Sequence, residues 1–581
     1  MNDGEPARSL ADRPMSALSA QLDTLSLELL ERIPPGAATI LEVGCGAGIL
    51  GAAYKRLNPR ARVLGIEPDA AAARIAATRL NEVAVAEIDA ASLPFECPNG
   101  IDCLIFRDVL PRLRDPWAAL RKFVESLAPD GIVLATIPNV EHWSLTSRLL
   151  QGSWDYEDAG LLDRAHLRWF TLESARRALD EAGLVFLDSV SGTFDADLAK
   201  GFVAALAPAL SALGADAQSY ARRAAPLHYM LRASRRQPDV LYIVGTALVP
   251  VGGVSQVRVL DPLRSLSAEP GIVTMLSNGR ELPDLDAEAP KVFILHRPAM
   301  TGPESLEGIR QILARDYVIV TEFDDHPDYI PILQSGGEVQ NFRAVHAVQT
   351  STEALADVLR KDNDEVVVFP NGIRALPDVR NFAQASHMTA FFGGLNREND
   401  WPSCVNALNA VAAKVGSRLH FAIVHDRGLF DALETPYKTF APTLDYPAYM
   451  DLLSRCELSF MPLSDTPFNR AKSDLKFLEA AACRVAALAS EVVYSDTIQD
   501  GRSGILFRNP EELERGLLRL VADFGLARSL GDAARAWVAE HRMLAYQIGQ
   551  RVAWYRSLWS RREELTEALI RRVPQLAENP D

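Results

Sequence analysis

The chain has 581 residues, too many for a single hydrophobic core, and one domain per ~150 residues suggests about three or four domains. Apolar residues make up 48% and charged residues 23%, with a mean hydropathy near zero, which excludes wholesale disorder. The 60 Lys and Arg residues against 76 Asp and Glu residues leave a formal charge of −16, which repels polyanions and argues against nucleic acid as the main partner.

The cysteines and the apolar segments indicate the solubility and the cellular compartment of the protein. The six cysteines form no CxxC pair and no metal-ligand spacing, so we interpret them as buried, reduced thiols. The N-terminus lacks the basic cap and apolar stretch of a secretory signal. The longest apolar run, near residues 201–213, is shorter than the ~20 residues of a membrane helix. These features predict a soluble, cytoplasmic protein.

Short β-rich runs alternate with helical stretches along most of the chain, which is typical of α/β folds with parallel sheets covered by helices. The predicted strands fall into three blocks: 38–43, 62–67, 84–88, 101–106, 131–137 and 184–190; then 239–246, 271–278, 291–298, 317–323 and 365–371; then 388–395, 419–426, 457–463, 484–490 and 504–507. Residues 194–236 are Ala-rich and carry no β signal, so we expect a helical connector there.

A glycine-rich segment, ILEVGCGAGILG at residues 40–51, follows the first predicted strand and opens a helix. Backbone amides at such a helix start favour a nucleotide-like ligand. From Gly46 onward the segment satisfies the G-x-G-x-x-G pattern of dinucleotide sites, a weak signal alone. From Glu42 onward it gives E-x-G-x-G-x-G, which resembles motif I of class I S-adenosylmethionine-dependent methyltransferases.

Later residues favour the methyltransferase interpretation over NAD binding. Glu67 closes the second strand, where a carboxylate accepts both ribose hydroxyls, although NAD would use it equally. Asp89 follows the third strand, where the resemblance implies contact with the adenine. The stretches IDCLIFRDVLPRLRDPWAAL and LAPDGIVLATIPN resemble the family's fourth and fifth strands with the helix between them. The resemblance implies an S-adenosyl-L-methionine site formed by Glu42, Gly44, Gly46, Gly48, Glu67 and Asp89.

The most specific resemblance lies in residues 137–171, IPNVEHWSLTSRLLQGSWDYEDAGLLDRAHLRWFT, which resemble methyltransferases found in polysaccharide-biosynthesis proteins. The whole resemblance covers about residues 35–193. These enzymes usually carry Glu-His after the fourth strand, and this chain has Pro111-Arg112 there. The role of that Glu-His pair therefore does not transfer.

Methyl transfer to a hydroxyl is an in-line displacement that needs alignment and a base. The candidates are His142, which follows the fifth strand, and Asp163 and His166, which share one face of a turn or helix. The alternative is that Asp163, Arg164 and His166 pin a surface loop. We expect one base among the three candidates.

The second and third blocks suggest two Rossmann-like lobes facing a cleft. FPNGI at residues 369–373 resembles the segment that crosses between the lobes of GT-B glycosyltransferases. Gly252-Gly253 follows the first strand of the second block and opens a helix, as a glycine loop does in those enzymes. The resemblance predicts a GT-B pair with a nucleotide-sugar site in the C-terminal lobe.

Residues 469–490, NRAKSDLKFLEAAACRVAALAS, resemble the donor-binding helix and following strand of that family. Lys476 and Glu479 match the Lys and Glu that serve the nucleotide sugar; Ser473 and helix-end amides suit a diphosphate. Arg397 is placed like a basic residue that contacts the same diphosphate. The alternative for Lys476 and Glu479 is a surface ion pair.

Two departures weaken this second resemblance. A Lys that the family often carries a few residues after Arg397 is missing, and Ala471 stands where one group of retaining enzymes has a second Glu. Retention or inversion therefore stays open, and so does turnover itself.

The triplet Asp324-Asp325-His326 ends a strand and points toward the same cleft by the strand-end rule. It suits a base for an acceptor hydroxyl, a divalent metal, or a loop shaped by Asx-type hydrogen bonds; we predict no metal site. His296 is a weaker candidate. Near the C-terminus, an amphipathic helix with Trp554, Tyr555 and Trp559 either packs across the lobes or touches a membrane that carries a lipid-linked acceptor.

Together these features predict a bifunctional enzyme of glycan biosynthesis that uses S-adenosylmethionine and a nucleotide sugar, with a glycan or glycosylated acceptor. The expected domains are a methyltransferase (20–193), the connector (194–236), the two GT-B lobes (237–380 and 381–540) and a C-terminal helix and tail (541–581). One rival makes the GT-B half an inactive carbohydrate-binding module, and another makes the first domain an NAD-dependent oxidoreductase. The oligomeric state, the donor sugar and the acceptor stay open.

Overall fold

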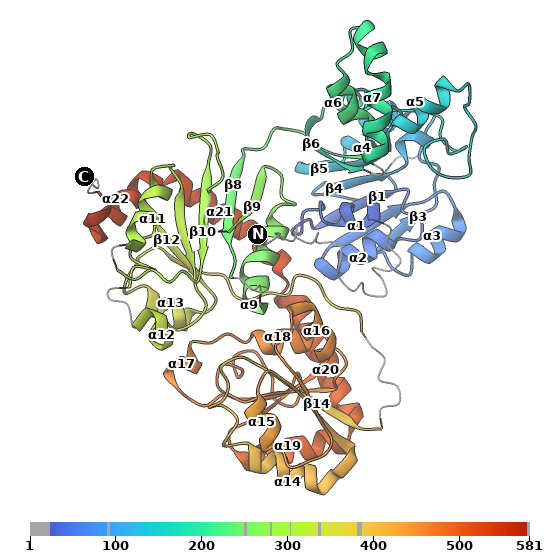
Figure 1. Cartoon of the computed structure of the whole chain (residues 1–581). Coiled ribbons are helices and arrows are strands. Elements are labelled where there is room, and N and C mark those ends of the chain that lie inside the picture. The colour runs from blue at the N-terminus through green and yellow to red at the C-terminus, as the bar shows by residue number, and fades with distance from the viewer. Residues whose placement is uncertain are drawn as a thin grey trace. The chain divides into compact units, whose positions relative to one another are not determined.

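The computed structural model describes residues 24–89, 93–193, 196–248, 252–278, 282–302, 304–334, 339–379 and 386–577. These residues fall into two compact units (Figure 1). The first unit comprises Leu18–Asp239 with Ala268–Gly271, and the second comprises Val240–Ser267 with Ile272–Asp581.

The described residues of the first unit form a seven-stranded sheet with the order β3-β2-β1-β4-β5-β7-β6. The strands are β1 (Thr39–Val43), β2 (Arg62–Ile66), β3 (Glu82–Ala84), β4 (Ile101–Arg107), β5 (Leu127–Pro138), β6 (Val185–Thr193) and β7 (Pro226–Ser234). Strands β1 to β5 pair in parallel, whereas β7 runs antiparallel to both β5 and β6. The strands β1, β4 and β5 are almost wholly buried, as apolar runs in a parallel sheet require.

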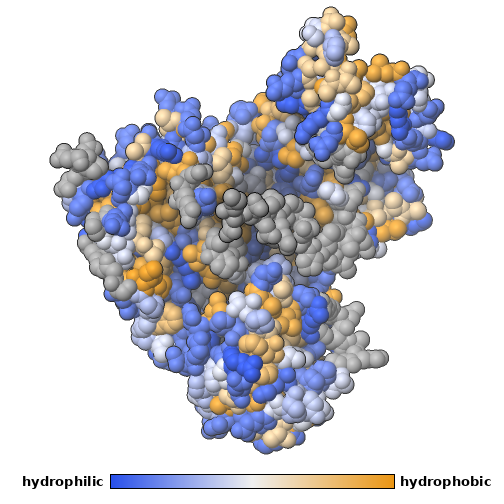
Figure 2. All heavy atoms as spheres, viewed as in Figure 1, coloured by the Kyte–Doolittle hydropathy of each residue, from blue (hydrophilic) through white to orange (hydrophobic). Residues whose placement is uncertain are grey.

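Helices connect these strands and cover the sheet (Figure 1). They are α1 (Thr24–Leu30), α2 (Ile49–Leu57), α3 (Ala70–Ala76), α4 (Pro116–Val124), α5 (Trp143–Leu150), α6 (Leu172–Glu181), α7 (Ala196–Ala212) and α8 (Ala217–Ala224), with a 3-10 turn η2 (Leu110–Arg112). Side-chain caps start several of them: Asp115 accepts from the Ala118 amide at α4, and Thr171 forms a capping box at α6. In Figure 2, hydrophobic residues lie at the surface in the region of α7. Leu198 of this helix is exposed.

The prediction of a helical connector over 194–236 is wrong for its last part. Residues 196–212 and 217–224 are helical, but β7 pairs with two strands of the first sheet and belongs to that unit. The sequence PLHYMLRAS hides the strand because His228 and Arg232 interrupt its apolar pattern. The Arg232 guanidinium is kept in the buried strand by an ion pair with Asp188 of β6. The third strand is also earlier than predicted, at 82–84.

The described residues of the second unit form two six-stranded sheets whose neighbouring strands are all parallel. The first sheet, with the order β13-β12-β11-β10-β8-β9, defines the N-terminal lobe: β8 (Leu241–Thr246), β9 (Ile272–Ser277), β10 (Lys291–His296), β11 (Val318–Glu322), β12 (Ala347–Thr350) and β13 (Val366–Val368). The second, with the order β16-β15-β14-β17-β18-β19, defines the C-terminal lobe: β14 (Met388–Gly393), β15 (Leu419–Val424), β16 (Lys438–Ala441), β17 (Leu458–Met461), β18 (Ala486–Ser490) and β19 (Ile505–Phe507). Strands β12 and β16 were not predicted, because their four residues, AVQT and KTFA, mix polar and apolar side chains.

The helices of the second unit follow the same alternation. Those of the N-terminal lobe are α9 (Gly253–Ser255), a π-helical turn (Gln256–Leu260), α10 (Asp261–Leu266), α11 (Glu304–Leu313), α12 (Pro331–Gln334) and α13 (Glu353–Leu359), with the 3-10 turn η4 (Pro327–Tyr329). Those of the C-terminal lobe are α14 (Val405–Val415), α15 (Arg427–Ala432), α16 (Tyr446–Leu453), α17 (Pro467–Arg470), α18 (Leu475–Ala482), α19 (Pro510–Ala522) and α20 (Phe524–His541).

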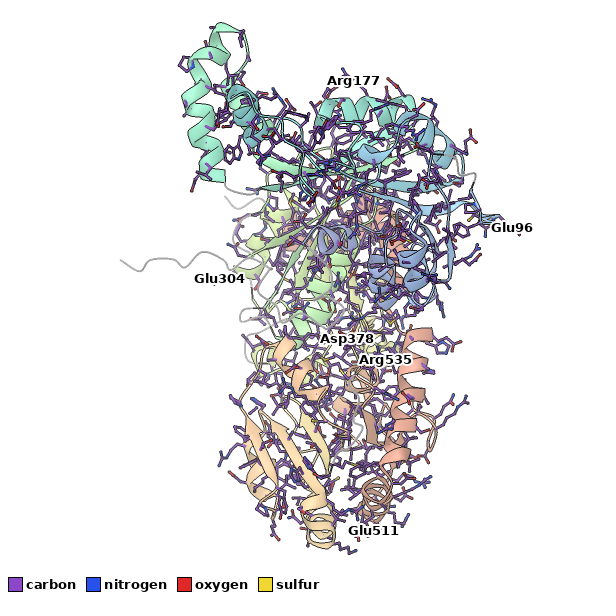
Figure 3. The ribbon with its side chains drawn as sticks, turned by 90° about the vertical axis from the view of Figure 1, so that its right-hand side faces the viewer. Glu96, Arg177, Glu304, Asp378, Glu511 and Arg535 are labelled. Atoms are coloured by element: carbon purple, nitrogen blue, oxygen red, sulfur yellow. The ribbon has the colours of Figure 1, made fainter. Side chains whose placement is uncertain are left out.

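The C-terminal helices return to the N-terminal lobe. Helix α20 packs on the C-terminal lobe, and Arg535 on it donates to the Pro377 carbonyl (2.7 Å), beside the labelled Asp378 (Figure 3). Helices α21 (Ile548–Ser560) and α22 (Arg562–Arg572) then contribute to the core of the N-terminal lobe. Tyr555 is fully buried and donates to Gln349 Oε1 (2.7 Å). The aromatic side chains of this segment therefore serve packing.

Two expectations about sequence segments can be compared with the structure. Five of the six cysteines are buried, Cys97 is half-buried, and all six are free thiols. This confirms the interpretation of buried, reduced cysteines for five of them. Within the described residues, every helix is too short or too polar to cross a membrane.

Candidate active sites

The glycine loop of the first unit runs from the end of β1 to the start of α2. Gly44, Gly46 and Gly48 have left-handed backbones with φ of 75°, 53° and 70°. A Cβ on Gly44 would lie 2.3 Å from Val109 Cγ2, whereas a Cβ on Gly46 would meet no other described atom within 4 Å. The loop therefore needs glycine for its path and leaves open space beside Gly46, where a ligand can approach the backbone.

Two carboxylates flank this loop. Glu67, directly after β2, accepts from the Gly46 amide through Oε2 (2.8 Å) and from the Asp69 amide through Oε1 (3.0 Å). Glu42, in β1, is fully buried, and burial raises its pKa to about 7 even though Arg107 opposes the rise. Glu67 thus fixes the loop at the strand ends, while Glu42 is held in the interior behind it.

The loop stands where the strand order of the sheet reverses, because β2 lies on one side of β1 and β4 on the other. In open α/β sheets, ligands bind at this point, at the carboxyl ends of the strands. Asp89 is exposed, beyond the end of β3, and accepts from the Arg114 amide (3.2 Å). The structure brings Gly46 and Glu67 into direct contact and ties Asp89 to the segment before α4.

Two of the candidate bases in the first unit are buried histidines. His142 caps α5, with Nδ1 2.7 Å from Ser144 Oγ. His166 Nδ1 lies 3.4 Å from the Leu161 carbonyl oxygen. Both rings are therefore positioned by a neighbour on one side, as a proton-transferring imidazole needs.

The third candidate, Asp163, has a different environment. It pairs with Arg112 (2.9 Å) and accepts from the Ala165 amide (2.8 Å). The neighbouring Pro111 carbonyl accepts from the Leu167 amide (2.7 Å). Pro111 and Arg112, which depart from the family's Glu-His, thus anchor the 161–168 loop, and Asp163 is one of the anchor points.

The second unit contains a cavity of about 250 Å³ lined by both lobes. The residues that line it and were predicted from the sequence are Gly252, Gly253, Asp324 and Asp325 from the N-terminal lobe and Arg397, Ser473, Lys476 and Glu479 from the C-terminal lobe. Of the eight, the first four follow β8 and β11. Arg397 follows β14, Ser473 stands just before α18, and Lys476 and Glu479 lie on α18. Parallel strands bring them together because their carboxyl ends meet at one edge of each sheet.

Lys476 and Glu479 form an ion pair of 3.1 Å, but it is not a surface pair, because Glu479 is only 1% exposed. The Lys476 ammonium also donates to Tyr449 Oη (2.9 Å). Burial and the charge of Glu479 raise the pKa of Tyr446 and Tyr449 well above the ordinary value, so both phenols stay neutral. Tyr446 lies close to Gly253 of the other lobe, where a Cβ would be 3.2 Å from its ring.

Arg397 and Ser473 are held in different ways. Arg397 pairs with the buried Asp400 (3.2 Å), which also accepts from Asn469 Nδ2 (2.6 Å). Ser473 Oγ accepts from Asn371 Nδ2 (2.8 Å) in the segment between the lobes. Both side chains therefore reach the cavity from a rigid support.

The interlobe segment is tied to a buried ion pair. Arg258 Nη1 donates to the Phe369 carbonyl (2.7 Å) and to Asn371 Oδ1 (2.9 Å), while its Nε and Nη2 donate to Glu322 (2.8 and 3.0 Å). Both charges are almost fully buried. Asn371 thus connects Ser473 of one lobe to Arg258 of the other.

The two aspartates that follow β11 share one partner, Arg297, which holds them unequally. Arg297 donates to Asp324 Oδ1 (2.6 Å) and to Asp325 Oδ2 (3.3 Å). Burial alone would raise the pKa of Asp324, but Arg297, together with Arg258 and His296, holds the pKa below its ordinary value. Arg297 itself has a left-handed backbone, with φ of 44°, a strained conformation typical of functional positions.

His326, the third member of the triplet, and the nearby His296 stay outside the cavity lining that the described residues form. His326 caps η4, where its Nδ1 accepts from the Asp328 amide (3.3 Å). His296 is buried beside Ser255, and burial lowers its pKa to about 4. Among the described residues, His, Cys, Asp and Glu form no group of three able to hold a metal ion.

Residues 15–189 match the family model described as a methyltransferase domain, and residues 386–523 match that of glycosyl transferases group 1. The chain joins a methyltransferase domain to a group 1 glycosyltransferase domain. The first match favours the methyl donor over the NAD alternative. We call the first unit the methyltransferase unit and the second the glycosyltransferase unit.

Curated relatives match the methyltransferase domain. An uncharacterised methyltransferase of Mycobacterium tuberculosis is 28% identical over 137 residues, which are 21% of this chain and 68% of that protein. The ubiquinone biosynthesis O-methyltransferase of Albidiferax ferrireducens is 30% identical over 125 residues, which are 20% of this chain and 49% of that protein.

Solved structures with similarity to the chain include Anabaena HepE and S. aureus TarM. Anabaena HepE, solved with UDP and glucose, has a TM-score of 0.38 and 14% identity, with 55% of this chain and 99% of HepE covered. S. aureus TarM, solved with UDP, fondaparinux and alpha-GlcNAc-glycerol, has a TM-score of 0.36 and 15% identity, with 46% of this chain covered. The chain spans about half of TarM, 55% of its length.

Sequence reasoning missed several residues of the glycosyltransferase cavity: Arg297, Tyr446, Tyr449 and Lys472. The two tyrosines are three residues apart and share a face of α16, a spacing that marks a common surface but not its partner. Lys472 stands directly before Ser473, inside the segment already singled out. Its basic character next to a predicted phosphate contact was the signal available in the sequence.

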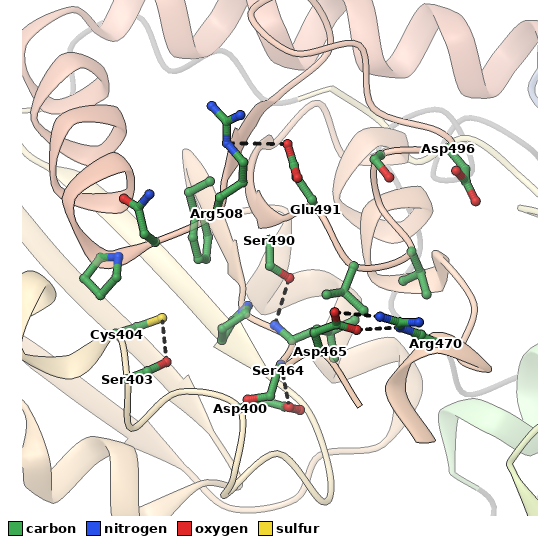
Figure 4. Close-up of a pocket in the computed structure, with 18 residues that line it drawn as sticks. Asp400, Ser403, Cys404, Ser464, Asp465, Arg470, Ser490, Glu491, Asp496 and Arg508 are labelled. Atoms are coloured by element: carbon green, nitrogen blue, oxygen red, sulfur yellow. Dashed lines mark hydrogen bonds and ion pairs between the residues drawn. The ribbon is translucent and has the colours of Figure 1, made fainter. Parts of the chain in front are cut away.

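A second, larger cavity of about 750 Å³ lies on the C-terminal lobe (Figure 4). Four of its charged groups pair with one another: Asp465 pairs with Arg470 (2.6 Å), and Glu491 approaches Arg508 (3.7 Å). Ser490 Oγ accepts from the Leu463 amide (2.9 Å). Within the described part of the chain, this larger cavity is lined by none of the predicted site residues. The smaller cavity is therefore the candidate donor site.

Proposed function

We propose that the chain is a bifunctional enzyme of glycan biosynthesis: it transfers a glycosyl group from a nucleotide sugar to a glycan or glycosylated acceptor and a methyl group from S-adenosylmethionine to a sugar hydroxyl. The observation that carries the proposal is the cavity lined by both lobes, where eight predicted residues meet. Tethering the two domains would raise the effective concentration of one product at the other site.

In the methyltransferase unit, the residues fit S-adenosylmethionine, which supplies an electrophilic methyl group when bound. Gly46 leaves space for the ligand beside the backbone, and a Cβ there would fill it. Glu67 stands at the end of β2, where its carboxylate can accept the ribose hydroxyls. Glu42, Gly44 and Gly48 shape the loop, and we assign the adenine contact to Asp89.

The methyl acceptor needs a base close to the methyl group. Because Asp163 is paired with Arg112, we propose His142 or His166 as the base and Asp163 as the residue that positions the loop. Three aromatic side chains in the same 137–171 segment support a sugar acceptor: Trp154 and Tyr156 lie 5.9 and 6.3 Å from Trp169, measured between ring centroids. Aromatic faces bind the apolar faces of sugar rings.

In the glycosyltransferase unit, the cavity fits a nucleotide sugar. Glu479 offers a buried carboxylate to ribose hydroxyls, while Arg397, Lys476, Ser473 and the amides of Gly252 and Gly253 can meet a diphosphate. Positive charge that is already in place stabilises a leaving nucleoside diphosphate without reorganisation. The donor chemistry therefore comes from electrostatics that this chain supplies.

For the acceptor hydroxyl we propose Asp325 as the base. Its contact with Arg297 is longer than that of Asp324 (3.3 against 2.6 Å), so Asp324 serves to hold Arg297 and Asp325 faces the cavity with more freedom. His326 stays a predicted contributor from the same turn.

The proposed domains keep the predicted boundaries except at the connector. We place the methyltransferase domain at 20–193 together with the strand at 226–234, which completes its sheet. The lobes at 237–380 and 381–540 and the C-terminal segment at 541–581 follow. Because both donors are charged small metabolites, we propose the cytoplasm as the site of action, with a lipid-linked glycan as one acceptor class.

A second candidate function follows from Ala471. This residue is buried, and its carbonyl accepts from Thr352 Oγ1 (3.0 Å), so no carboxylate stands where one group of retaining enzymes has a Glu. In that case the two lobes bind nucleotide or glycan without turnover and present the glycan to the methyltransferase.

Isothermal titration of the full chain with S-adenosylmethionine, NAD, UDP and GDP tests the proposal, with Gly46→Arg and Glu479→Ala as variants. We expect Gly46→Arg to lose only S-adenosylmethionine and Glu479→Ala to lose only the nucleoside diphosphate. Multiple turnover of a nucleotide sugar, measured by release of the diphosphate, would exclude the binding module. Binding of NAD in place of S-adenosylmethionine would refute the methyltransferase half.

A further inference from the structure

One basic side chain that lines the donor cavity, Lys472, has no role in the proposed donor site. Three basic side chains of the C-terminal lobe line the cavity: Arg397, Lys472 and Lys476. Arg397 pairs with Asp400, and Lys476 pairs with Glu479. Lys472 makes neither an ion pair nor a hydrogen bond through its ammonium group within the described ranges; its recorded contact is with the Phe468 ring, 4.1 Å from Nζ to the centroid.

The backbone around Lys472 is held firmly. Its amide donates to the Asn469 carbonyl (3.1 Å), and the preceding Ala471 carbonyl accepts from Thr352. The following Ser473 is bonded to Asn371. Lys472 therefore stands at a fixed point between α17 and α18, and its side chain reaches the cavity in which the α18 residues Lys476 and Glu479 also lie.

The charges that face Lys472 come from three elements. Arg397 follows β14, with Asp400 close behind it; Arg297 follows β10 and Asp325 follows β11. Burial is the main cause that lowers the pKa of Lys472 to about 8, and Arg397 lowers it further, while Asp325 and Asp400 oppose the change. Lys472 is thus a half-buried ammonium that lies beside another cation and has no carboxylate partner. A bound anion would stabilise its charge.

We propose that Lys472 binds the diphosphate of the donor nucleotide together with Arg397, in place of the Lys that is missing after Arg397. This inference rests on the proposed glycosyltransferase function and adds to it a residue from a different part of the lobe. Because a phosphate is bound as a set of charges, an ammonium that reaches it from α17–α18 serves as well as one from the β14 loop.

The proposal has a pH dependence with a defined sign. Below pH 8 Lys472 is protonated and ready to bind a diphosphate; above pH 8 the free protein must take up a proton to bind. Affinity for the diphosphate should therefore fall up to about tenfold per pH unit above 8. Tyr446 and Tyr449 do not contribute, since their pKa values lie well above the ordinary value.

The test is isothermal titration of the full chain at pH 7 and pH 9 with UDP and uridine, or with GDP and guanosine if the wild type prefers guanine. Lys472→Met removes the charge, Lys472→Arg keeps a charge that does not titrate, and Lys414→Met, on the exposed face of α14, is the matched control. We expect Lys472→Met to weaken diphosphate binding about 10- to 100-fold at pH 7 and to leave nucleoside binding unchanged. Lys472→Arg should bind the diphosphate equally at both pH values.

The outcomes separate this inference from the function on which it rests. Wild-type binding of the diphosphate that Lys472→Met retains would overturn the role of Lys472 and leave the donor site intact. An equal loss for nucleoside and diphosphate would also overturn it, because the variant would then have altered the site as a whole. No binding of either diphosphate by the wild type would refute the donor site, and the role of Lys472 with it.

Discussion

Replacing Glu42 by Gln should stabilise the methyltransferase unit at alkaline pH. Glu42 is buried in β1, where its pKa of about 7 stands above the ordinary 4.5. The folded state therefore holds the proton more tightly than the unfolded state. Stability is highest while the carboxyl is protonated in both states and falls as pH rises through 4.5 to 7, because the folded state must then bury a charge.

The size of the effect follows from the two pKa values. At about 1.36 kcal/mol per pKa unit, the rise from 4.5 to about 7 corresponds to roughly 3 kcal/mol once both states are ionised. At pH 5.5 roughly 1.4 kcal/mol of this loss is already present, and at pH 8.5 nearly all of it is. The difference in free energy of unfolding between Glu42→Gln and the wild type should thus grow by about 2 kcal/mol from pH 5.5 to pH 8.5. How well the amide packs does not affect this change, because packing contributes equally at both pH values.

Hydrogen exchange followed by mass spectrometry on the full chain measures this difference in peptides that cover β1 and β2. The ratio of exchange rates, wild type over Glu42→Gln, should rise about 30-fold from pH 5.5 to pH 8.5, since 1.4 kcal/mol is a factor of ten. Glu87→Gln, an exposed carboxyl in the same unit, should leave the ratio constant. A ratio that does not change with pH would refute the assignment of a buried, proton-holding Glu42.

Three further predictions concern other parts of the chain. Glu322→Gln leaves the buried Arg258 without its counter-charge and should cost about 3–5 kcal/mol in calorimetric unfolding of the glycosyltransferase unit; a loss below about 1 kcal/mol would contradict this. Gly44→Ala forces a Cβ against Val109 at a left-handed position and should cost about 1–3 kcal/mol and weaken S-adenosylmethionine binding, which titration would detect; unchanged affinity would sink the steric argument. Trp154→Ala should raise the KM for the methyl acceptor about three- to tenfold without changing S-adenosylmethionine affinity; an unchanged KM would remove the aromatic cluster from the acceptor site.

The fold could be predicted well where local pattern and tertiary environment agree. The buried parallel strands β1, β4 and β10 are mostly apolar, and their sequences favour a strand. Strand β7 could not be predicted in the same way. Its Arg232 fits a buried strand because Asp188 of the neighbouring β6 accepts its charge, and that partner is 44 residues away in the sequence. A long-range ion pair of this kind has no local signal.

The sequence could predict those site residues that belong to a recognisable motif. Gly46 and Glu67 follow the ends of two strands, β1 and β2, that the motif spacing already relates, and the structure joins them by a hydrogen bond. Arg297 could not be foreseen as the partner of Asp324 and Asp325, because its guanidinium reaches them from the end of the adjacent strand. The pairing of strand ends across a sheet decides such contacts, and single-strand patterns do not contain it.

The departures from the family patterns follow one physical rule, that a charge requirement is satisfied in space and not at a fixed place in the chain. Around the donor cavity, Arg297, Arg397 and Lys476 each have a carboxylate partner, which offsets part of their charge before a ligand arrives. Lys472 is the basic side chain that remains uncompensated among the described lining residues. An incoming diphosphate therefore shares Arg397 with Asp400, whereas in Lys472 it meets a charge that no carboxylate has paired, and this difference is why one lysine outside the expected position can decide whether the lobe binds its donor.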